Sequence, residues 1–155
     1  MVIIEPVRVE RTYVQSLRAR PGAVFPLLCP VREREWVEGW DPVAVYSRSG
    51  LAEEDCVFVT EDAERESVWM ITRRDSERLR LEMIKVTPAM TVGKITISLR
   101  EDGEGLTEAV VTYMYTALSE DGVRFVEAYT EDCFAEFMGY WEKTLNEFLE
   151  SGARS

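Results

Sequence analysis

The sequence predicts an α+β domain in which a single antiparallel sheet of about seven strands is followed by one long C-terminal helix, with two short helices after the first strand. Three observations support this fold class. Apolar and polar residues alternate along most of the chain up to residue 118, which is typical of strands. Tight turns separate the alternating segments, and after them the apolar residues change to a helical spacing.

The N-terminal part of the chain predicts a strand and two short helices. Alternation over residues 6–19 indicates a long first strand. Pro21 ends this strand and suits the first turn of a short helix over residues 23–28. Pro30 separates that helix from a second short helix over residues 31–36.

Six further strands are expected to form a meander. Gly50, the stretch 75–77 and the glycines at 103 and 105 mark tight turns between them, and the glycines permit positive φ. Because the turns are short, consecutive strands are expected to pair in one antiparallel sheet. The six strands cover residues 43–47, 56–60, 67–74, 78–86, 90–100 and 106–118.

The parity of the strands predicts which side chains are buried. Apolar residues occupy every second position of the last three strands and oppose charged or Thr residues, so we expect them on the inner face. For residues 56–60 and 67–72 both parities carry apolar residues, and both assignments stay open. The expected inner positions are Leu79, Leu81, Met83, Ile95, Ile97, Leu99, Ala109, Val111, Tyr113, Tyr115 and Ala117.

The segment from 119 to 149 predicts one long amphipathic helix. Ser119 is a good N-cap, and Glu120 and Asp121 place negative charge in the first turn. Gly152 follows the last apolar position, as expected at a helix C-terminus. Residues at three- and four-residue spacing define the expected buried face. They are Val126, Thr130, Cys133, Phe137, Trp141, Thr144 and Phe148.

Composition excludes several functions. The chain of 155 residues suits a single domain over 1–155, and its net charge of −11 would repel a nucleic-acid backbone. It contains no histidine, which removes Ser-His-Asp and Cys-His catalysis and histidine metal sites. Three dispersed cysteines form no disulfide framework or zinc motif, which favours a reducing, cytoplasmic location. No long apolar run or signal segment indicates membrane insertion or secretion.

The order of elements, together with several short motifs, is similar to that of a known superfamily. The motifs are PGAVF at 21–25, CPVREREW at 29–36 with Gly39 and Trp40, Val68 with Trp69, and TALS at 116–119. In this order and spacing the chain resembles the SRPBCC superfamily of helix-grip proteins. That group includes START-like lipid-transfer domains, birch-pollen-allergen-like proteins and polyketide cyclases, and the sequence does not assign a subgroup.

The resemblance implies a curved sheet wrapped around the C-terminal helix, with an apolar cavity between them. It implies binding or transport of a small hydrophobic or amphipathic ligand, such as a lipid, a polyketide or an aromatic compound, with no cofactor. A polyketide cyclase or aromatase, and a protein-interaction module like the activators of the heat-shock chaperone ATPase, are the alternatives. Either a monomer or a homodimer is compatible with the sequence.

Candidate site residues follow from this implied cavity, although ordinary core packing is the alternative for each of them. No catalytic or metal-ligating residue is expected. Trp36 and Trp40 are placed at the cavity mouth. Cys133 is expected to be a small buried residue. Arg73 and Arg74 are expected to form a surface pair, and the alternative is that one of them points inward to pair with an acidic group of the ligand. The expected lining residues are Trp69, Met83, Tyr113, Tyr115, Thr130, Phe134, Phe137, Met138 and Trp141.

Overall fold

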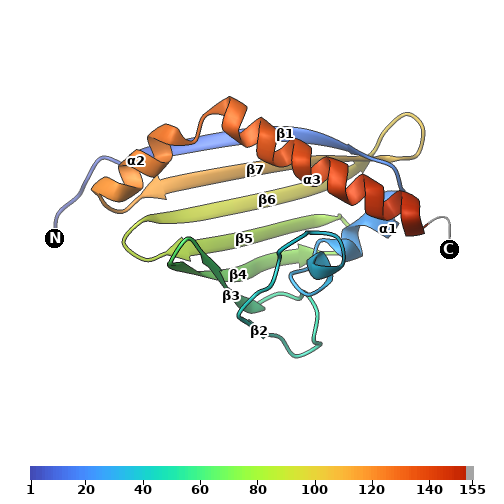
Figure 1. Ribbon diagram of the computed structural model, residues 1–155, viewed down its shortest axis with the longest axis horizontal. Coiled ribbons are helices and arrows are strands. Elements are labelled where there is room, and N and C mark those ends of the chain that lie inside the picture. The colour runs from blue at the N-terminus through green and yellow to red at the C-terminus, as the bar shows by residue number, and fades with distance from the viewer. Residues whose placement is uncertain (153–155) are drawn as a thin grey trace.

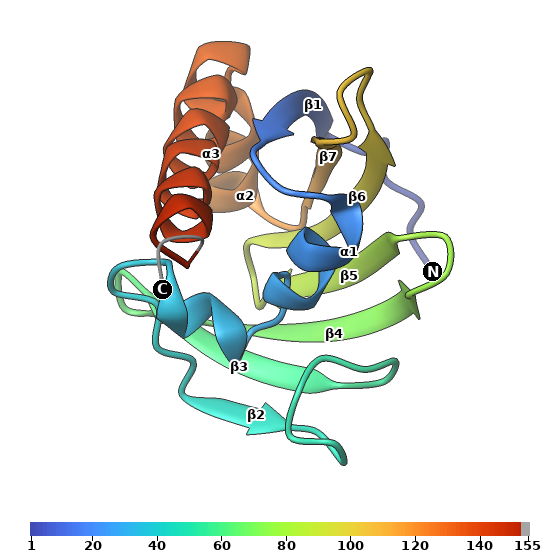
Figure 2. The same ribbon diagram turned by 90° about the vertical axis from the view of Figure 1, so that its right-hand side faces the viewer.

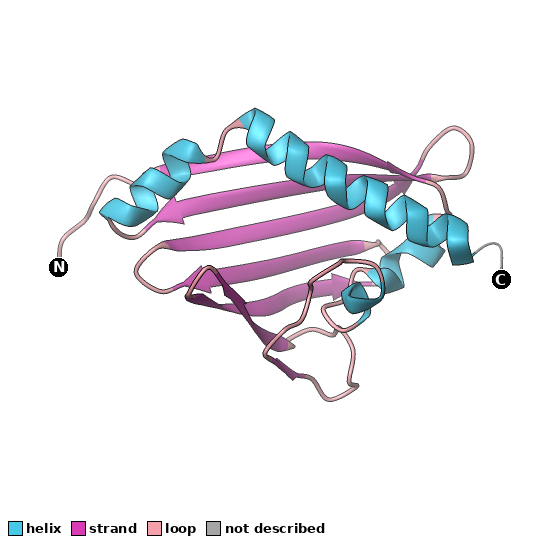
Figure 3. Cartoon of the chain, viewed as in Figure 1, coloured by secondary structure: helices cyan, strands magenta, loops and turns pink. Residues whose placement is uncertain are grey.

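A seven-stranded antiparallel sheet dominates the computed structural model, which describes residues 1–152 (Figures 1 and 3). The strand order is β1-β7-β6-β5-β4-β3-β2, so every strand after β1 pairs with its neighbour in sequence. This is the meander that the sequence predicts, closed by the first strand against the last. The strands are β1 Arg8–Leu17, β2 Ala44–Tyr46, β3 Val57–Asp62, β4 Arg65–Asp75, β5 Arg80–Thr87, β6 Thr91–Glu101 and β7 Thr107–Ala117.

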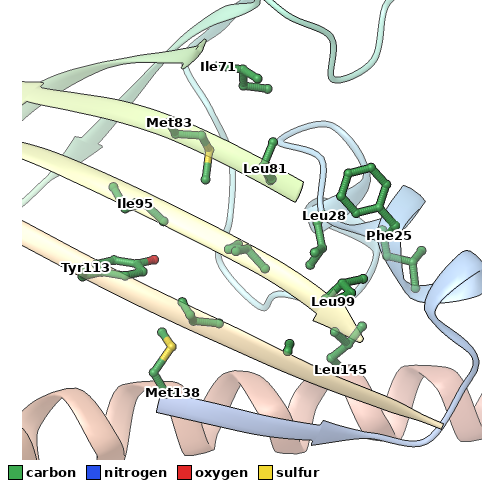
Figure 4. Packing of buried hydrophobic residues seen from close by; sticks show 14 of the residues in the cluster. Phe25, Leu28, Ile71, Leu81, Met83, Ile95, Leu99, Tyr113, Met138 and Leu145 are labelled. Atoms are coloured by element: carbon green, nitrogen blue, oxygen red, sulfur yellow. The ribbon is translucent and has the colours of Figure 1, made fainter. Parts of the chain in front are cut away.

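The helices lie on one side of this sheet. Figure 2 shows the sheet curling from β1 round to β2, with α2 and α3 on its open side and the short helices at one end. The side chains of the inner face pack into one apolar cluster with residues of α3 and of the short helices (Figure 4). The helical elements are α1 Pro21–Val24, the 3₁₀ turns η1 Phe25–Leu27 and η2 Arg32–Glu35, α2 Glu120–Ala128 and α3 Glu131–Gly152.

The inner and outer faces of the sheet follow the predicted parity. Leu81, Met83, Ile95, Ile97 and Leu99 are all buried, as are the expected positions 109, 111, 113 and 115 of β7. The structure also resolves the parity that the sequence left open. In β4 the inner residues are the odd-numbered Ser67, Trp69 and Ile71, whereas Val68 and Met70 are each 40% exposed on the outer face.

A β-bulge in β4 changes the parity of that strand. The pairing with β5 shifts between Ile71 and Arg73, so that Arg74 pairs with the inward-facing Leu81. The Arg74 guanidinium therefore reaches the inner side, where it donates hydrogen bonds to the carbonyls of Leu28 (2.9 Å) and Phe25 (3.3 Å). It also lies 4.5 Å from the centre of the Phe25 ring. Arg74 is therefore not part of the expected surface pair, and it attaches η1 to the sheet.

The C-terminal helix is not continuous, which corrects the sequence prediction. The chain leaves the helical path at Tyr129, whose ψ of 69° ends α2. Thr130 then starts α3, because its Oγ1 accepts a hydrogen bond from the backbone N–H of Cys133 (3.1 Å). Arg11 stabilises the break by donating to the Tyr129 carbonyl (3.1 Å).

The break resets the helical register and changes the buried face. In α3 the buried residues are Phe134, Met138, Leu145 and Asn146, whereas Cys133 is exposed. The prediction of a buried Cys133 is therefore wrong, because it extended the spacing of α2 through a point where the helix stops. No helix within residues 1–152 has the length and apolarity needed to cross a membrane.

Candidate functional site

A pocket of about 600 Å³ lies between the inner face of the sheet, α3 and the segment around η2. Strands β3 to β7 form its floor, and the segment 37–41 and the aromatic residues of α3 form its sides. Most of its large side chains are aromatic. These are Trp40, Phe58, Trp69, Tyr113, Tyr115, Phe125, Tyr129, Phe137, Tyr140 and Trp141.

One aromatic group lies at the β3–β4 side of the pocket. The Phe58 and Trp69 rings, from paired positions on β3 and β4, stack with centroids 5.2 Å apart. Trp40 meets both rings edge-on, at 6.3 Å and 6.5 Å. Both indole N–H groups are hydrogen-bonded within the protein, that of Trp40 to the Pro30 carbonyl and that of Trp69 to Thr60 Oγ1. This wall is therefore fixed in position and presents carbon surface to the pocket.

A second aromatic group connects the sheet to the two helices. Tyr113 on β7 contacts Phe137 of α3, with ring centroids 6.2 Å apart. Phe137 in turn packs against Trp141 at 5.8 Å. Tyr115, two residues further along β7, meets Tyr129 edge-on at 5.1 Å. The pocket thus has aromatic surfaces on opposite sides, which suits a flat or apolar occupant.

A buried carboxyl, Glu33, lies in the wall of this pocket. The backbone of η2 places it inward, because its N–H donates to Cys29 (2.8 Å) and its carbonyl accepts from Val37 (2.7 Å). The residue is 8% exposed, and within residues 1–152 its carboxyl has no hydrogen-bond or ion-pair partner. Burial raises the pKa of the Glu33 carboxyl to about 8, so the group is mainly a neutral acid at pH 7.

The tyrosine hydroxyls of the pocket are also without protein partners. Tyr113 and Tyr115 are buried, and no hydroxyl hydrogen bond is made by either within the described part of the chain. Burial raises the pKa of Tyr113 well above its ordinary value, and the neighbouring Tyr115, Tyr129 and Glu33 raise it further. No fully enclosed side-chain oxygen or nitrogen in residues 1–152 lacks a partner. The unpaired oxygens of Glu33 and Tyr113 are therefore accessible, and the pocket is the space they face.

Lys85 is the basic residue of the pocket wall. It occupies the same inward-facing parity of β5 as Leu81 and Met83, between Trp69 on β4 and Gly93 on β6. Its ammonium lies 4.7 Å from the centre of the Trp69 ring. Burial lowers the pKa of Lys85, and the carboxylate of Asp62 acts in the opposite direction.

Gly93 makes room for this arrangement. A Cβ at position 93 would lie 2.7 Å from the ring of Tyr115, its cross-strand partner on β7. The absence of a side chain lets the Tyr115 ring lie over β6 next to Lys85. A single row across the sheet, from Trp69 through Lys85 and Gly93 to Tyr115, therefore forms part of the pocket floor.

The structure brings most of the sequence-predicted site residues to this pocket. Figure 4 shows Met83 and Tyr113 on neighbouring parts of the inner face, and both lie in the pocket wall. Trp69, Tyr115, Phe137 and Trp141 also line the pocket. So does Trp40, which was expected at the cavity mouth.

Four predicted site residues lie elsewhere. Thr130 is exposed and caps α3, because the helix restarts at this residue. Phe134 and Met138 are 2% and 0% exposed and belong to the packed core under α3. Trp36 is buried, donates to the Leu27 carbonyl (3.1 Å) and packs edge-on against Trp141. It connects η2 to α3 and does not border the pocket.

The sequence reasoning missed Glu33 and Lys85, although signals for both were present. Glu33 lies four residues after Cys29 and three before Trp36, the spacing of one helical face. Lys85 continues the parity of Leu81 and Met83 by one step. Both were overlooked because a charged residue is ordinarily assigned to the surface.

The fold and the pocket together define a helix-grip protein with an aromatic-lined interior site. No family model and no curated protein matches the sequence. Solved structures do resemble the chain. A Staphylococcus aureus protein of unknown function, SA2116, matches with a TM-score of 0.72 and 12% identity over 97% of this chain and 99% of that one.

Two further solved structures that resemble the chain are those of named proteins. Norcoclaurine synthase from Thalictrum flavum matches with a TM-score of 0.68 and 11% identity, covering 93% of this chain and 87% of its own. DynU16, from the dynemicin biosynthetic locus, matches with a TM-score of 0.60 and 14% identity, over 92% of this chain and 48% of its own. At these identities the likeness shows the fold alone, and it confirms the helix-grip architecture that the sequence predicts.

Proposed function

We propose that the chain binds a small aromatic or amphipathic molecule in the pocket between the sheet and α3. The observation that carries this proposal is a pocket of about 600 Å³ whose walls are aromatic and whose polar groups at Glu33 and Tyr113 have no protein partner among residues 1–152. Ligand sites in proteins typically measure roughly 300–1,000 Å³ and combine apolar walls with a few orienting polar groups.

The nature of the walls explains why the ligand is aromatic or apolar. Ring contacts fix the side chains of Phe58, Trp69 and Trp40 before any ligand arrives, so binding needs little reordering. A flat apolar molecule would replace water over carbon surface and gain the ordinary hydrophobic free energy. Neighbours such as norcoclaurine synthase support a small-molecule function for this fold.

Native mass spectrometry and calorimetry test the proposal. Freshly purified protein is expected to carry a co-purified small molecule or, once stripped, to bind naphthol as a neutral aromatic probe. Phe137→Ala should weaken naphthol binding several-fold, since this ring lines the pocket and is 40% exposed, so that its removal costs little stability. Met70→Ala is the matched control, because Met70 is also 40% exposed but lies on the outer face.

The measurements distinguish a ligand in the pocket from an interaction at the surface. Binding that Phe137→Ala weakens and Met70→Ala leaves unchanged supports a pocket ligand. If the protein carries no small molecule and naphthol gives no heat of binding, the proposal fails and a surface-based interaction becomes the better explanation.

A second candidate is an enzyme of the polyketide cyclase or aromatase type. It is favoured by the two groups in one pocket whose pKa values burial displaces toward neutrality, Glu33 upward and Lys85 downward. Such a pair can exchange protons with a bound substrate. Turnover of a polyketide or carbonyl substrate that Glu33→Gln and Lys85→Met each abolish would favour the enzyme, whereas binding without turnover favours a carrier.

A further inference from the structure

We propose that the ligand of this pocket is a cation, an aromatic or alkyl amine whose ammonium group binds the Glu33 carboxyl next to the Tyr113 hydroxyl. This inference rests on the proposed function and specifies the chemistry of the ligand. It follows from three independent properties of the pocket: an unpaired buried carboxyl, an excess of negative charge, and ring faces that favour positive charge.

The first property is the isolation of Glu33. A buried carboxyl is costly unless a hydrogen-bond or ion-pair partner compensates for the lost water. Within residues 1–152 no side chain or backbone group partners the Glu33 carboxyl, although the residue is only 8% exposed. Tyr113 is close enough for the Glu33 charge to affect its pKa, and its hydroxyl is likewise unpaired. A ligand with several N–H donors, such as a primary ammonium, would give the Glu33 carboxyl the partner that the protein does not supply.

The second property is the charge of the pocket wall. Five carboxyls line it: Glu33, Glu38, Asp41, Glu61 and Asp62. Burial leaves Glu33 mainly neutral, and the other four lie at exposed positions of the wall, where they make the potential of the pocket negative. The net charge of −11 for the whole chain has the same sign. An anionic ligand would be repelled by this field, and a cationic one would be attracted.

Lys85 is the single basic side chain of the wall, and it is already compensated. Its ammonium lies over the Trp69 ring at 4.7 Å, and the Asp62 carboxylate acts on it from the neighbouring hairpin. Lys85 therefore does not balance the carboxyls near η2. If the ligand carries a second, acidic group, we expect that group to lie toward Lys85.

The third property is the arrangement of rings near α3. Phe137 and Trp141 of α3 and Tyr113 of the sheet all border the pocket. The face of an aromatic ring carries partial negative charge and attracts an ammonium group. Rings and a carboxyl together are the recurrent means of holding an amine away from water. They would also hold the apolar part of the same ligand.

Binding of an amine would change the protonation of Glu33. Since burial raises the pKa of this carboxyl to about 8, it is mainly protonated at neutral pH in the empty pocket. A bound ammonium favours the carboxylate, so the carboxyl O–H loses its proton to solvent while the ligand keeps its own. Lys85 is the one basic group among the other titratable side chains that line this space. The remaining ones are Glu38, Asp41, Glu61, Asp62, Cys29, Cys133 and the tyrosines at 113, 115, 129 and 140.

A charge series on one skeleton tests the inference by calorimetry. Phenylbutylamine, phenylbutanol and phenylbutyrate share a phenyl ring and chain and differ in a cationic, neutral or anionic end. The amine is expected to bind about tenfold more tightly than the alcohol, the ratio that one charge-assisted hydrogen bond supplies, and the acid least tightly. Titration in two buffers of different ionisation enthalpy should show proton release with the amine.

Two glutamine variants identify the carboxyl responsible. Glu33→Gln should reduce the amine to the affinity of the alcohol, leave alcohol binding unchanged and abolish proton release. Glu38→Gln makes the same change of charge at an exposed position of the pocket wall, and it should leave most of the preference intact. Unchanged alcohol binding also shows that a variant is folded.

Several results would overturn the inference. They are equal binding of amine and alcohol, tighter binding of the acid, an undiminished preference in Glu33→Gln, or equal losses in both variants. If naphthol binds but no member of the charge series does, the proposal of an amine ligand is wrong, whereas the proposal that the pocket binds a small molecule is still supported. If neither naphthol nor the series binds, both proposals fall.

Discussion

At the scale of single residues, burial of Glu33 links the stability of the fold to pH. Burial raises the pKa of this carboxyl to about 8 in the folded chain, compared with an ordinary value of 4.5. Between these values the folded state holds one proton more than the unfolded state. The contribution of Glu33 to the stability of the fold is therefore fully present below pH 4.5 and is lost as the pH rises toward 8.

This linkage gives a testable slope. For wild-type protein we expect Glu33 to lower the free energy of unfolding by up to about 1.4 kcal/mol per pH unit across that window. Glu33→Gln removes the titration, so the variant should lose this decline and gain stability relative to wild type as the pH approaches 8. Urea unfolding at a series of pH values measures both curves. Parallel curves would show that Glu33 titrates normally.

Glu53 provides a contrast at the same scale. Its pKa is lowered to about 2, mainly by the hydrogen bond from the Ser47 hydroxyl (2.5 Å) and by the N–H of Ser49. Its contribution to stability is therefore fully present above pH 4.5 and is lost as the pH falls toward 2, below the window in which Glu33 acts. The effects of Glu33 and Glu53 on stability can thus be distinguished by pH alone.

At the scale of elements, α2 is placed by close contact with the β5–β6 turn. Ser119 caps the helix through Gly122 N–H (3.0 Å) and donates to the Ala89 carbonyl (2.5 Å). At Gly122 a Cβ would overlap the carbonyl oxygen of Met90. Glycine is required at position 122 because the backbone of α2 lies in close contact there with the backbone of the β5–β6 turn.

Two glycine-to-alanine variants test that contact. Gly122→Ala should destabilise the protein by about 1–3 kcal/mol, because the helix must move away from Met90. Gly139→Ala, within α3, places a Cβ at an ordinary 3.9 Å from the Tyr13 hydroxyl and should stabilise by about 0.5–1 kcal/mol through helix propensity. Thermal unfolding of both variants measures the difference. If both variants are destabilised to a similar extent, the effect of Gly122→Ala does not come from the contact with Met90.

The restart of the helix shows what sequence patterns can resolve. Thr130-Glu131-Asp132 repeats the Ser119-Glu120-Asp121 signal that correctly predicted the start of α2. The prediction followed the three- and four-residue spacing through Thr130 instead, because that spacing continues past the break as far as Phe148. Local capping chemistry was therefore the more reliable guide here.

At the scale of the whole molecule, the strands could be predicted from the sequence, but the approach of residues that lie far apart in the sequence could not. Alternation gave the inner residues of β5, β6 and β7, since one face of each is buried. The approach of Glu33 to Tyr113 depends on how η2 packs under α3, across a sequence separation that no local pattern describes. The bulge after Ile71, which turns Arg74 inward, is equally invisible to a simple alternation.

The sheet order also sets how stability is distributed. β6 and β7 are eleven-residue strands with a paired strand along each edge, whereas β2 is a three-residue edge strand paired only with β3. Hydrogen exchange followed by mass spectrometry should find the amides of β6 and β7 exchanging last and those of β2 first. Protection of β2 equal to that of β6 would mean that the sheet opens only as a whole.

The concentration of tryptophan around the pocket has a practical consequence. Trp40, Trp69 and Trp141 border it, and Trp36 touches Trp141 at 5.2 Å, so all four tryptophans of the chain belong to one neighbourhood. The ultraviolet emission of the protein therefore originates almost wholly at the site. A guest that expels solvent from that space will alter the colour and intensity of this light, and unlabelled protein can report its own occupancy.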